Sequence, residues 1–185
     1  WGIFIRTRSK PLYLLGFIMS SVFLLVDIIH PEYQSKNLMP ALQSPWFIPH
    51  VVIYMISYAV LAAACLTVLI GVYNTYKNKV TDLESINFSM NLVYPGFALL
   101  SLGMIMGAVW AKIAWGDYWT WDAKETWALL TWLFYLLCIH LHFSFPKKQK
   151  LLMFLLAFSF VVLIITWLGI RYFPSGMNSV HVYGQ

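Results

Sequence analysis

Charged side chains are scarce in this sequence. Only 10% of its 185 residues are charged and only seven are Asp or Glu, whereas a soluble domain carries about 25% charged residues. Hydrophobic residues make up 61% of the chain, and the mean hydropathy is +0.72. This composition excludes an ordinary soluble globule, a disordered chain and a nucleic-acid-binding protein, although the net charge is +5. We expect an integral membrane protein.

Cysteine is equally scarce. The two cysteines, Cys65 and Cys138, lie far apart inside apolar runs, so they are poor candidates for a disulfide or a metal-binding pair. Ionisable residues are almost absent from the middle of the apolar runs, which argues against a proton-coupled or solute-coupled transporter. The sequence shows no internal repeat.

Five apolar runs are separated by polar breaks, and each is long enough to cross about 30 Å of hydrocarbon at 1.5 Å per residue. Backbone groups in lipid must be satisfied internally, and no run alternates as in a membrane barrel, so we expect helices. Pro95 predicts a kink or a local break in the third. The predicted fold is all-α, with five transmembrane helices at about Pro11–Ile29, Phe47–Tyr73, Phe88–Trp110, Asp122–Phe145 and Leu151–Phe173.

The basic residues are distributed unevenly between the loops. The positive-inside rule predicts a cytoplasmic N-terminus and external segments at residues 30–46, 111–121 and 174–185. We expect a single membrane domain over residues 1–185 and, because the sequence begins with Trp1, the core of a longer chain. Eight of the 12 Lys and Arg residues fall on the predicted cytoplasmic side: Arg6, Arg8, Lys10, Lys77, Lys79, Lys147, Lys148 and Lys150.

An aromatic segment at residues 110–122 lies on the predicted external side. Residues 115–122 read Trp-Gly-Asp-Tyr-Trp-Thr-Trp-Asp. Trp and Tyr favour the headgroup level of a membrane, so an interfacial belt is one interpretation. A belt spreads its aromatic residues over several helix ends, and the density in one loop equally fits a platform for a large flat ligand. Asp122 followed by Glu125 predicts a capping box that opens the fourth helix.

Two histidines are predicted on the same side as this segment. His50 lies at the external end of the second run, and His181 lies in the C-terminal segment. Either one alone is typical of an interfacial polar residue. Two imidazoles beside an aromatic platform are suited to axial ligation of haem iron, and the shared side favours that interpretation.

A second pair of histidines lies deeper in the membrane. His140 follows Asp122 by 18 residues, which corresponds to about 27 Å along a helix. His142 points in a different direction from His140, so at most one of them serves a given site. An ionisable residue inside a membrane is a candidate functional residue, whereas a position near a helix end also allows the side chain to reach the interface.

The sequence from Trp115 to Trp132 carries a recognisable signature. The pattern Trp-Gly-x-x-Trp-x-Trp-Asp, followed by Ala-Lys-Glu-Thr-Trp-Ala-Leu-Leu-Thr-Trp, resembles the tryptophan-rich WWD motif of haem-handling proteins in cytochrome c maturation. It is more similar to the system II synthetase proteins of the CcsA/ResC type than to the system I haem-delivery proteins. The segments around His50 and His181 are similar to that family's two external-histidine regions, so the resemblance covers about residues 42–184.

The resemblance implies roles for these residues. His50 and His181 would be the axial ligands of an external haem b iron. His140 would match the family's transmembrane histidine and ligate an inner haem iron together with a ligand from a CcsB/ResB-type partner subunit or fused half. The external haem would lie under the segment that contains Trp115, Trp119, Trp121 and Asp122.

The resemblance also implies a function, partners and a location. Such proteins transport haem and present it for covalent attachment to the two thiols of a Cys-x-x-Cys-His motif on apocytochrome c. This chain lacks that motif, so we expect it to be the handler, as part of a haem-attaching synthetase. Expected partners also include a thiol-reducing, thioredoxin-like protein and the lipid bilayer. The expected location is the bacterial inner membrane with the Trp-rich loop on the periplasmic face, or a thylakoid membrane.

Three other interpretations remain open from the sequence. A system I-type haem-delivery protein and a scaffold without a ligand are two of them. The third is a membrane haem b electron carrier, which typically places paired histidines on facing helices within the bilayer. The location of His50 and His181 at a helix end and in a loop argues against that third class.

Overall fold

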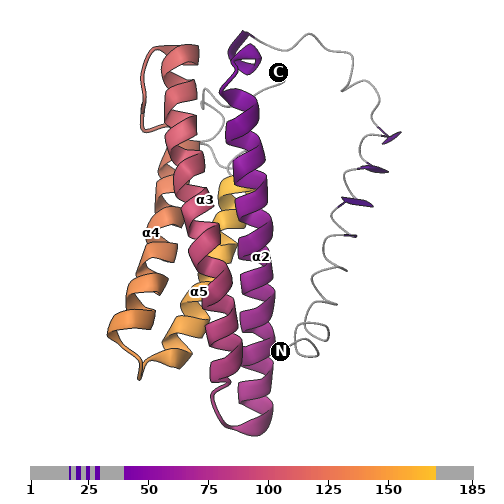
Figure 1. Cartoon of the computed structure of the whole chain (residues 1–185), viewed down its shortest axis with the longest axis vertical. Coiled ribbons are helices and arrows are strands. Elements are labelled where there is room, and N and C mark those ends of the chain that lie inside the picture. Colours follow the sequence, from indigo (N-terminus) through magenta and orange to yellow (C-terminus); the bar gives the residue numbers. More distant parts are fainter. Residues whose placement is uncertain (1–16, 18–19, 22–23, 26–27, 30–39, 170–185) are drawn as a thin grey trace. The chain divides into compact units, whose positions relative to one another are not determined.

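The computed structural model describes residues 17, 20–21, 24–25, 28–29 and 40–169. Residues 40–169 form an up-and-down bundle (Figure 1), and none of the described residues is in a strand. A short 3₁₀ helix, η2, precedes the bundle, and a π-helical turn, η3, follows it. In chain order the elements are η2 (Pro40–Gln43), α2 (Phe47–Asn78), α3 (Leu83–Trp115), α4 (Ala123–Ser144), α5 (Gln149–Ile164) and η3 (Ile165–Gly169).

The sequence predicted the number and order of the helices in this part of the chain correctly. Four helices among the described residues are long and apolar enough to cross a membrane, which confirms the all-helical prediction for this part. In the expected first span, the seven described residues between Phe17 and Ile29 are all helical. The other residues of that span lie outside the described part, so the fifth transmembrane helix and the orientation stay predictions.

The prediction of a local break at Pro95 is wrong. α3 continues through this residue. The ring lies on an exposed side of α3, so it does not disturb the packing against α2. The two helices also extend beyond the predicted spans, because polar residues such as Asn74 and Ser85 join their last and first turns.

α2 and α3 pack through a seven-residue repeat of small and apolar residues. A seven-residue repeat keeps one seam of a helix facing its partner along the full length, and small residues let two backbones approach within a membrane. Ser57 Oγ donates to the Gly96 carbonyl at 2.8 Å, and Ser89 Oγ donates to the Ala64 carbonyl at 2.7 Å. One row of α2 contains His50, Ser57, Ala64 and Gly71, and the facing row of α3 contains Ser89, Gly96, Gly103 and Trp110.

α4 and η3 are joined to this helix pair by polar and aromatic contacts. Trp132 of α4 donates its indole N–H to Ser101 Oγ of α3 at 2.8 Å, and its ring centroid lies 5.2 Å from that of Phe97. The hydroxyls of Thr131 and Thr166 lie 2.8 Å apart. π-Helical turns occur often at functional sites, and this one brings Thr166 to the same end of the bundle as His50.

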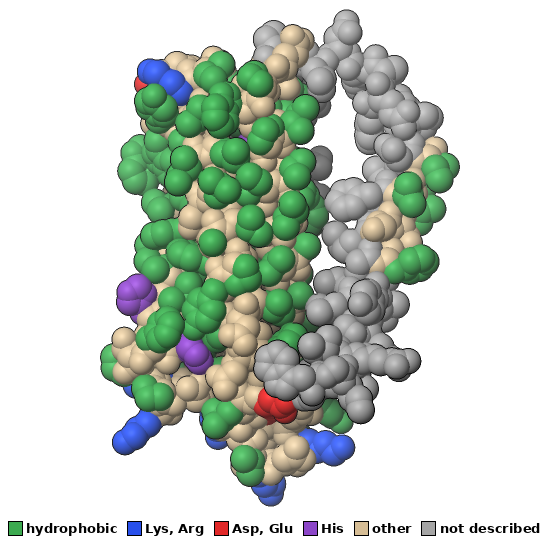
Figure 2. Space-filling view, viewed as in Figure 1, with side chains coloured by type: hydrophobic (Ala, Val, Ile, Leu, Met, Phe, Trp, Pro, Cys, Tyr) green, Lys and Arg blue, Asp and Glu red, His purple; other side chains and the backbone are tan. Residues whose placement is uncertain are grey.

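The two ends of the bundle differ in charge. The α2–α3 and α4–α5 connections lie at one end (Figure 1), and Figure 2 shows most of the visible basic side chains there, with a smaller basic patch at the other end. The α3–α4 loop, which contains most of the Trp-rich segment, lies at the opposite end. The basic residues of the lysine-rich end are Lys77, Lys79, Lys147, Lys148 and Lys150.

Candidate functional site

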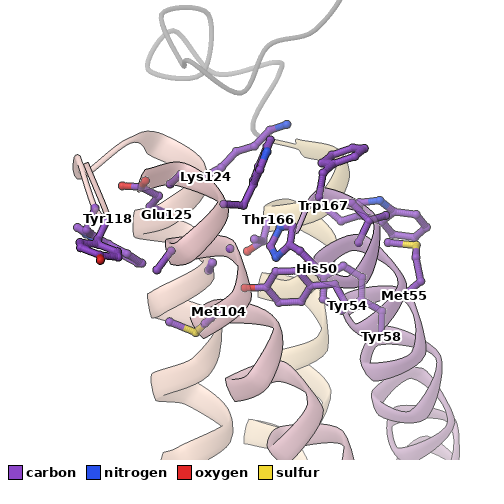
Figure 3. A pocket seen from close by; sticks show the side chains of 18 residues that line it. His50, Tyr54, Met55, Tyr58, Met104, Tyr118, Lys124, Glu125, Thr166 and Trp167 are labelled. Carbon is purple, nitrogen blue, oxygen red and sulfur yellow. The ribbon is translucent and has the colours of Figure 1, made fainter. Parts of the chain in front are cut away.

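A cavity of about 250 Å³ opens at the end of the bundle that carries the Trp-rich loop. α2, α3, α4, η3 and the α3–α4 loop all contribute to its lining. In Figure 3, His50 and Tyr54 extend from α2, whereas Lys124 and Glu125 extend from the first turn of α4. The lining is largely aromatic and apolar, and it includes Phe47, Tyr54, Met55, Tyr58, Met104, Trp110, Tyr118, Trp119 and Trp167.

The imidazole of His50 is held by the backbone of α3. Its Nδ1 lies 2.8 Å from the Gly103 carbonyl oxygen. A carbonyl oxygen only accepts, so Nδ1 carries the hydrogen, and in the neutral ring Nε2 carries the lone pair. The ring stacks on Trp110 at a centroid distance of 5.6 Å and meets Tyr54 edge-on at 4.8 Å. These contacts give the imidazole one orientation at the cavity wall.

Trp110 forms the rigid wall behind His50. Its side chain is only 2% exposed, and its indole N–H donates to the Ala41 carbonyl at 2.7 Å. The rings of Phe47 and Trp115 pack against it at centroid distances of 5.2 and 4.8 Å. Trp115 is therefore a supporting residue of this wall and does not itself line the cavity.

The Trp-rich loop is fixed at both ends. Gly116, with φ of 94°, ends α3 in the left-handed region that glycine adopts without strain, and its N–H donates to the Lys112 carbonyl at 3.1 Å. At the other end Asp122 and Glu125 form the predicted capping box. Glu125 Oε2 accepts from the N–H groups of Asp122 and Thr120 at 3.1 and 2.8 Å. One carboxylate thus joins the loop to the first turn of α4.

The loop orients its two remaining tryptophans differently. Trp119 lines the cavity together with His50. Trp121 has φ of 59°, an uncommon value for a non-glycine residue, and its side chain is 69% exposed. The two rings meet edge-on at 5.8 Å. Of the predicted platform, only Trp119 lines the cavity, whereas Trp121 packs edge-on against Trp119 and Asp122 caps α4.

The predicted inner histidines face different surroundings. His140 is exposed, and its Nδ1 lies 2.9 Å from the Leu136 carbonyl of its own helix. His142 is half-buried, its Nδ1 is enclosed without a hydrogen-bond partner among the described residues, and its ring lies 5.7 Å from that of Phe143. Figure 2 shows histidine side chains near the lysine-rich end of the bundle. His181 lies outside the described residues, so its position relative to His50 stays a prediction.

Several lining residues were not identified from the sequence. Tyr54 and Tyr58 follow His50 at spacings of four residues along α2, which places all three on one helix face. That spacing could have identified Tyr54 and Tyr58 as neighbours of His50 in the site. Thr166 and Trp167 gave no comparable signal, because the π-helical turn that orients them shifts the regular helical spacing.

Comparisons with known proteins identify the family of this chain. Residues 3–178 match the family described as Cytochrome C assembly protein. The protein named Cytochrome c biogenesis protein CcsA from Chlamydomonas reinhardtii is 32% identical over 171 residues, covering 88% of this chain and 48% of that protein. The protein of the same name from Prochlorococcus marinus (strain MIT 9312) is 36% identical over 177 residues, covering 78% and 57%.

A third relative matches this chain over a larger share of both proteins. The CcsA of Guillardia theta is 34% identical over 216 residues, covering 97% of this chain and 71% of that protein. The chain spans about half the length of the first two relatives. The resemblance carried by the tryptophan motif is confirmed: the chain belongs to the cytochrome c assembly protein family and is of the CcsA type.

Proposed function

We propose that this chain takes haem b into the cavity beside His50 and presents it for covalent attachment to apocytochrome c. The observation that carries the proposal is the meeting of an imidazole of defined tautomer with the Trp119 ring at one cavity. Haem iron accepts an axial imidazole, and aromatic side chains stack on flat π systems. The residues present therefore fit haem as the transported substrate.

The size of the cavity supports a site that presents haem to apocytochrome c over a site that stores haem. Sites that bury a small molecule typically measure about 300–1,000 Å³, and this cavity measures about 250 Å³. A porphyrin bound there would be enclosed in part and would keep an accessible edge. In thioether formation each cysteine sulfur bonds to one vinyl carbon of haem, and the thiol hydrogen goes to the neighbouring carbon. That reaction needs an accessible vinyl edge.

Two axial imidazoles complete the proposed external site. His181 is the proposed second ligand, from the C-terminal segment, and the pair would hold the iron and set its reduction potential. When apocytochrome c supplies the histidine of its own motif, one imidazole of this chain leaves the iron, which allows release. The absorption spectrum of the purified protein tests the function: a Soret band of histidine-ligated haem is expected, and failure to bind added haem would contradict the proposal.

Trp119 and Trp121 are expected to respond differently to the same substitution. Trp119→Leu keeps apolar area but removes the flat ring from the cavity, so haem binding should weaken by about 1–2 kcal/mol, which is roughly 5–30-fold in affinity. Trp121→Leu should have a smaller effect, because its ring is mostly exposed and reaches the site only through the edge of Trp119. Haem retained per folded protein is the measurement. Wild-type retention in both variants would assign the loop to an interfacial belt, and an equal loss in both would contradict the different roles of the two rings.

We also propose an inner haem site at His140. The exposed position of this residue on α4 supports a ligand set shared with another chain of the CcsB/ResB type. His140→Ala should lower the amount of haem that reaches the cavity, whereas His142→Ala should change it little, because its ring is half-buried and points elsewhere. The effects of both substitutions are measured as the haem content of the complex after expression with the partner. A larger loss in His142→Ala would contradict the assignment.

Partners and location complete the proposal. Candidate partners are apocytochrome c, a CcsB/ResB-type subunit and a thiol-reducing, thioredoxin-like protein. The chain is a membrane protein, with four described helices of spanning length. The lysine-rich end supports an orientation with the cavity on the external face, in a bacterial inner membrane or a thylakoid membrane.

A further inference from the structure

Two glycines of α3 lie directly against the His50 ring. A Cβ atom added to Gly107 would lie 2.6 Å from Cε1 and 2.9 Å from Nδ1 of His50. Real Cβ atoms do not come this close to other heavy atoms. Gly103, one turn earlier, provides the carbonyl that accepts the Nδ1–H at 2.8 Å. Both glycines lie inside α3, so neither forms a turn. The missing side chain of Gly107 makes room for His50, and that of Gly103 makes room for the Tyr54 ring, whose Cδ1 would lie 3.1 Å from an added Cβ atom.

The geometry of an α-helix explains why the two glycines act together. The side chain of a helical residue lies over the turn that precedes it, so a side chain at position 107 would cover the carbonyl of position 103. Without a side chain at Gly107, this carbonyl is accessible from the side. A carbonyl oxygen has two lone pairs, so it accepts both the N–H of its own helix and the imidazole of His50.

We propose that Gly107 is a positioning residue, which together with the Gly103 carbonyl fixes the tautomer and the orientation of His50 and leaves Nε2 as the nitrogen that would bind iron. This inference rests on the proposed function, because it takes His50 as an axial ligand. A backbone carbonyl that accepts the second ring N–H fixes the tautomer of a metal-binding histidine and raises the basicity of the ligating nitrogen. A more basic ligand favours ferric iron, so the same hydrogen bond lowers the reduction potential of the haem.

The Gly107→Ala variant tests the inference. The added methyl group displaces the imidazole and breaks its bond to Gly103. We expect haem retention to fall at least about tenfold, with partial recovery on addition of free imidazole. The remaining haem should show a more positive midpoint potential than in the wild-type protein. Wild-type retention with an unchanged potential would overturn the inference.

Gly96→Ala is the matched control. A Cβ atom there would lie 2.7 Å from Leu61 Cδ2 and 2.9 Å from its Cγ, an equally close contact in the same helix seam without a histidine. Its haem potential should equal that of the wild type, and added imidazole should have no effect. If imidazole restores haem equally in Gly96→Ala and Gly107→Ala, general damage to the seam explains the loss and the inference is wrong.

If Gly107→Ala folds poorly, a double-mutant cycle of melting temperatures on the haem-free protein tests the same packing contact. In the His50→Ala background the imidazole is absent, so Gly107→Ala should lower the melting temperature much less than in the wild-type background. An equal loss in both backgrounds would show that the methyl group clashes elsewhere. The cycle also distinguishes failure of the proposed function from failure of this inference. If His50→Ala alone leaves haem binding unchanged, the proposed function fails, whereas the packing of Gly107 against His50 is still measured.

Discussion

Replacement of His50 by alanine is expected to remove most of the haem bound at the cavity and to abolish cytochrome c maturation. The substitution removes the only imidazole among the residues that line the cavity in the described part of the chain. It leaves the Trp110 wall in place, because that ring is held by the Ala41 carbonyl and by Phe47. We expect haem retention to fall more than about tenfold, equivalent to more than about 1.4 kcal/mol.

The measurement is the Soret band per folded protein, together with the yield of mature cytochrome c in a strain that depends on this chain. Free imidazole should restore part of both, because it can enter the space that the side chain leaves. Tyr58→Phe is the matched control, since it alters a ring of the same cavity without removing a ligand and should mature cytochrome c normally. Unchanged haem and maturation in His50→Ala would refute the assignment of His50.

The second large effect is expected at Glu125. Its Oε2 accepts from the Thr120 and Asp122 N–H groups. Glu125→Ala removes these hydrogen bonds between the loop and α4 and leaves the weaker hold of the Asp122 and Thr126 side chains. Loss of a cap interaction typically destabilises a helix by about 0.5–2 kcal/mol. The released loop should no longer hold Trp119 at the cavity, so haem retention should fall further than in Trp119→Leu.

Limited proteolysis of the α3–α4 loop and haem retention measure this change. Glu125→Gln keeps one acceptor oxygen and should give an intermediate result. Glu84→Ala is the control, because Glu84 lies in the first turn of α3 at the opposite end of the bundle. If Glu125→Ala leaves both cleavage and haem unchanged, the loop keeps its shape without the carboxylate.

The capping box and the starts of α2 and α4 could be predicted because they depend on local sequence. Phe47 begins α2 as expected, and the Asp122–Glu125 pair caps α4. The wall of the cavity depends instead on which residues of α2 face which residues of α3. In a soluble helix the apolar stripe identifies the buried face, but in these helices residues exposed to lipid, such as Ile56 and Ile105, are as apolar as buried ones.

The pairing of His50 with Gly107 was therefore not apparent from hydrophobicity. The relevant signal is the seven-residue spacing of small residues, which places Gly96 and Gly103 one repeat apart on the seam. The orientation of Trp121 could not be predicted for a different reason. Its positive φ lies in the loop between the α3 end and the α4 cap, where no regular helical spacing predicts the direction of a side chain.

The unequal lengths of the helices affect how the bundle fits its bilayer. α3 has 33 residues and α4 has 22, which correspond to about 50 and 33 Å at 1.5 Å per residue. In Figure 1 the α3–α4 loop descends from the end of α3 to the start of α4, so α3, and α2 paired with it, extend beyond α4 at the end that carries the Trp-rich loop as well as at the lysine-rich end. At the lysine-rich end Asn74 and Asp82 share a 2.8 Å hydrogen bond in a polar setting. A thicker or thinner bilayer changes how many of the turns in the long α2–α3 pair it covers, so the hydrophobic mismatch falls on the ends of this pair, where polar groups such as these can meet the headgroups.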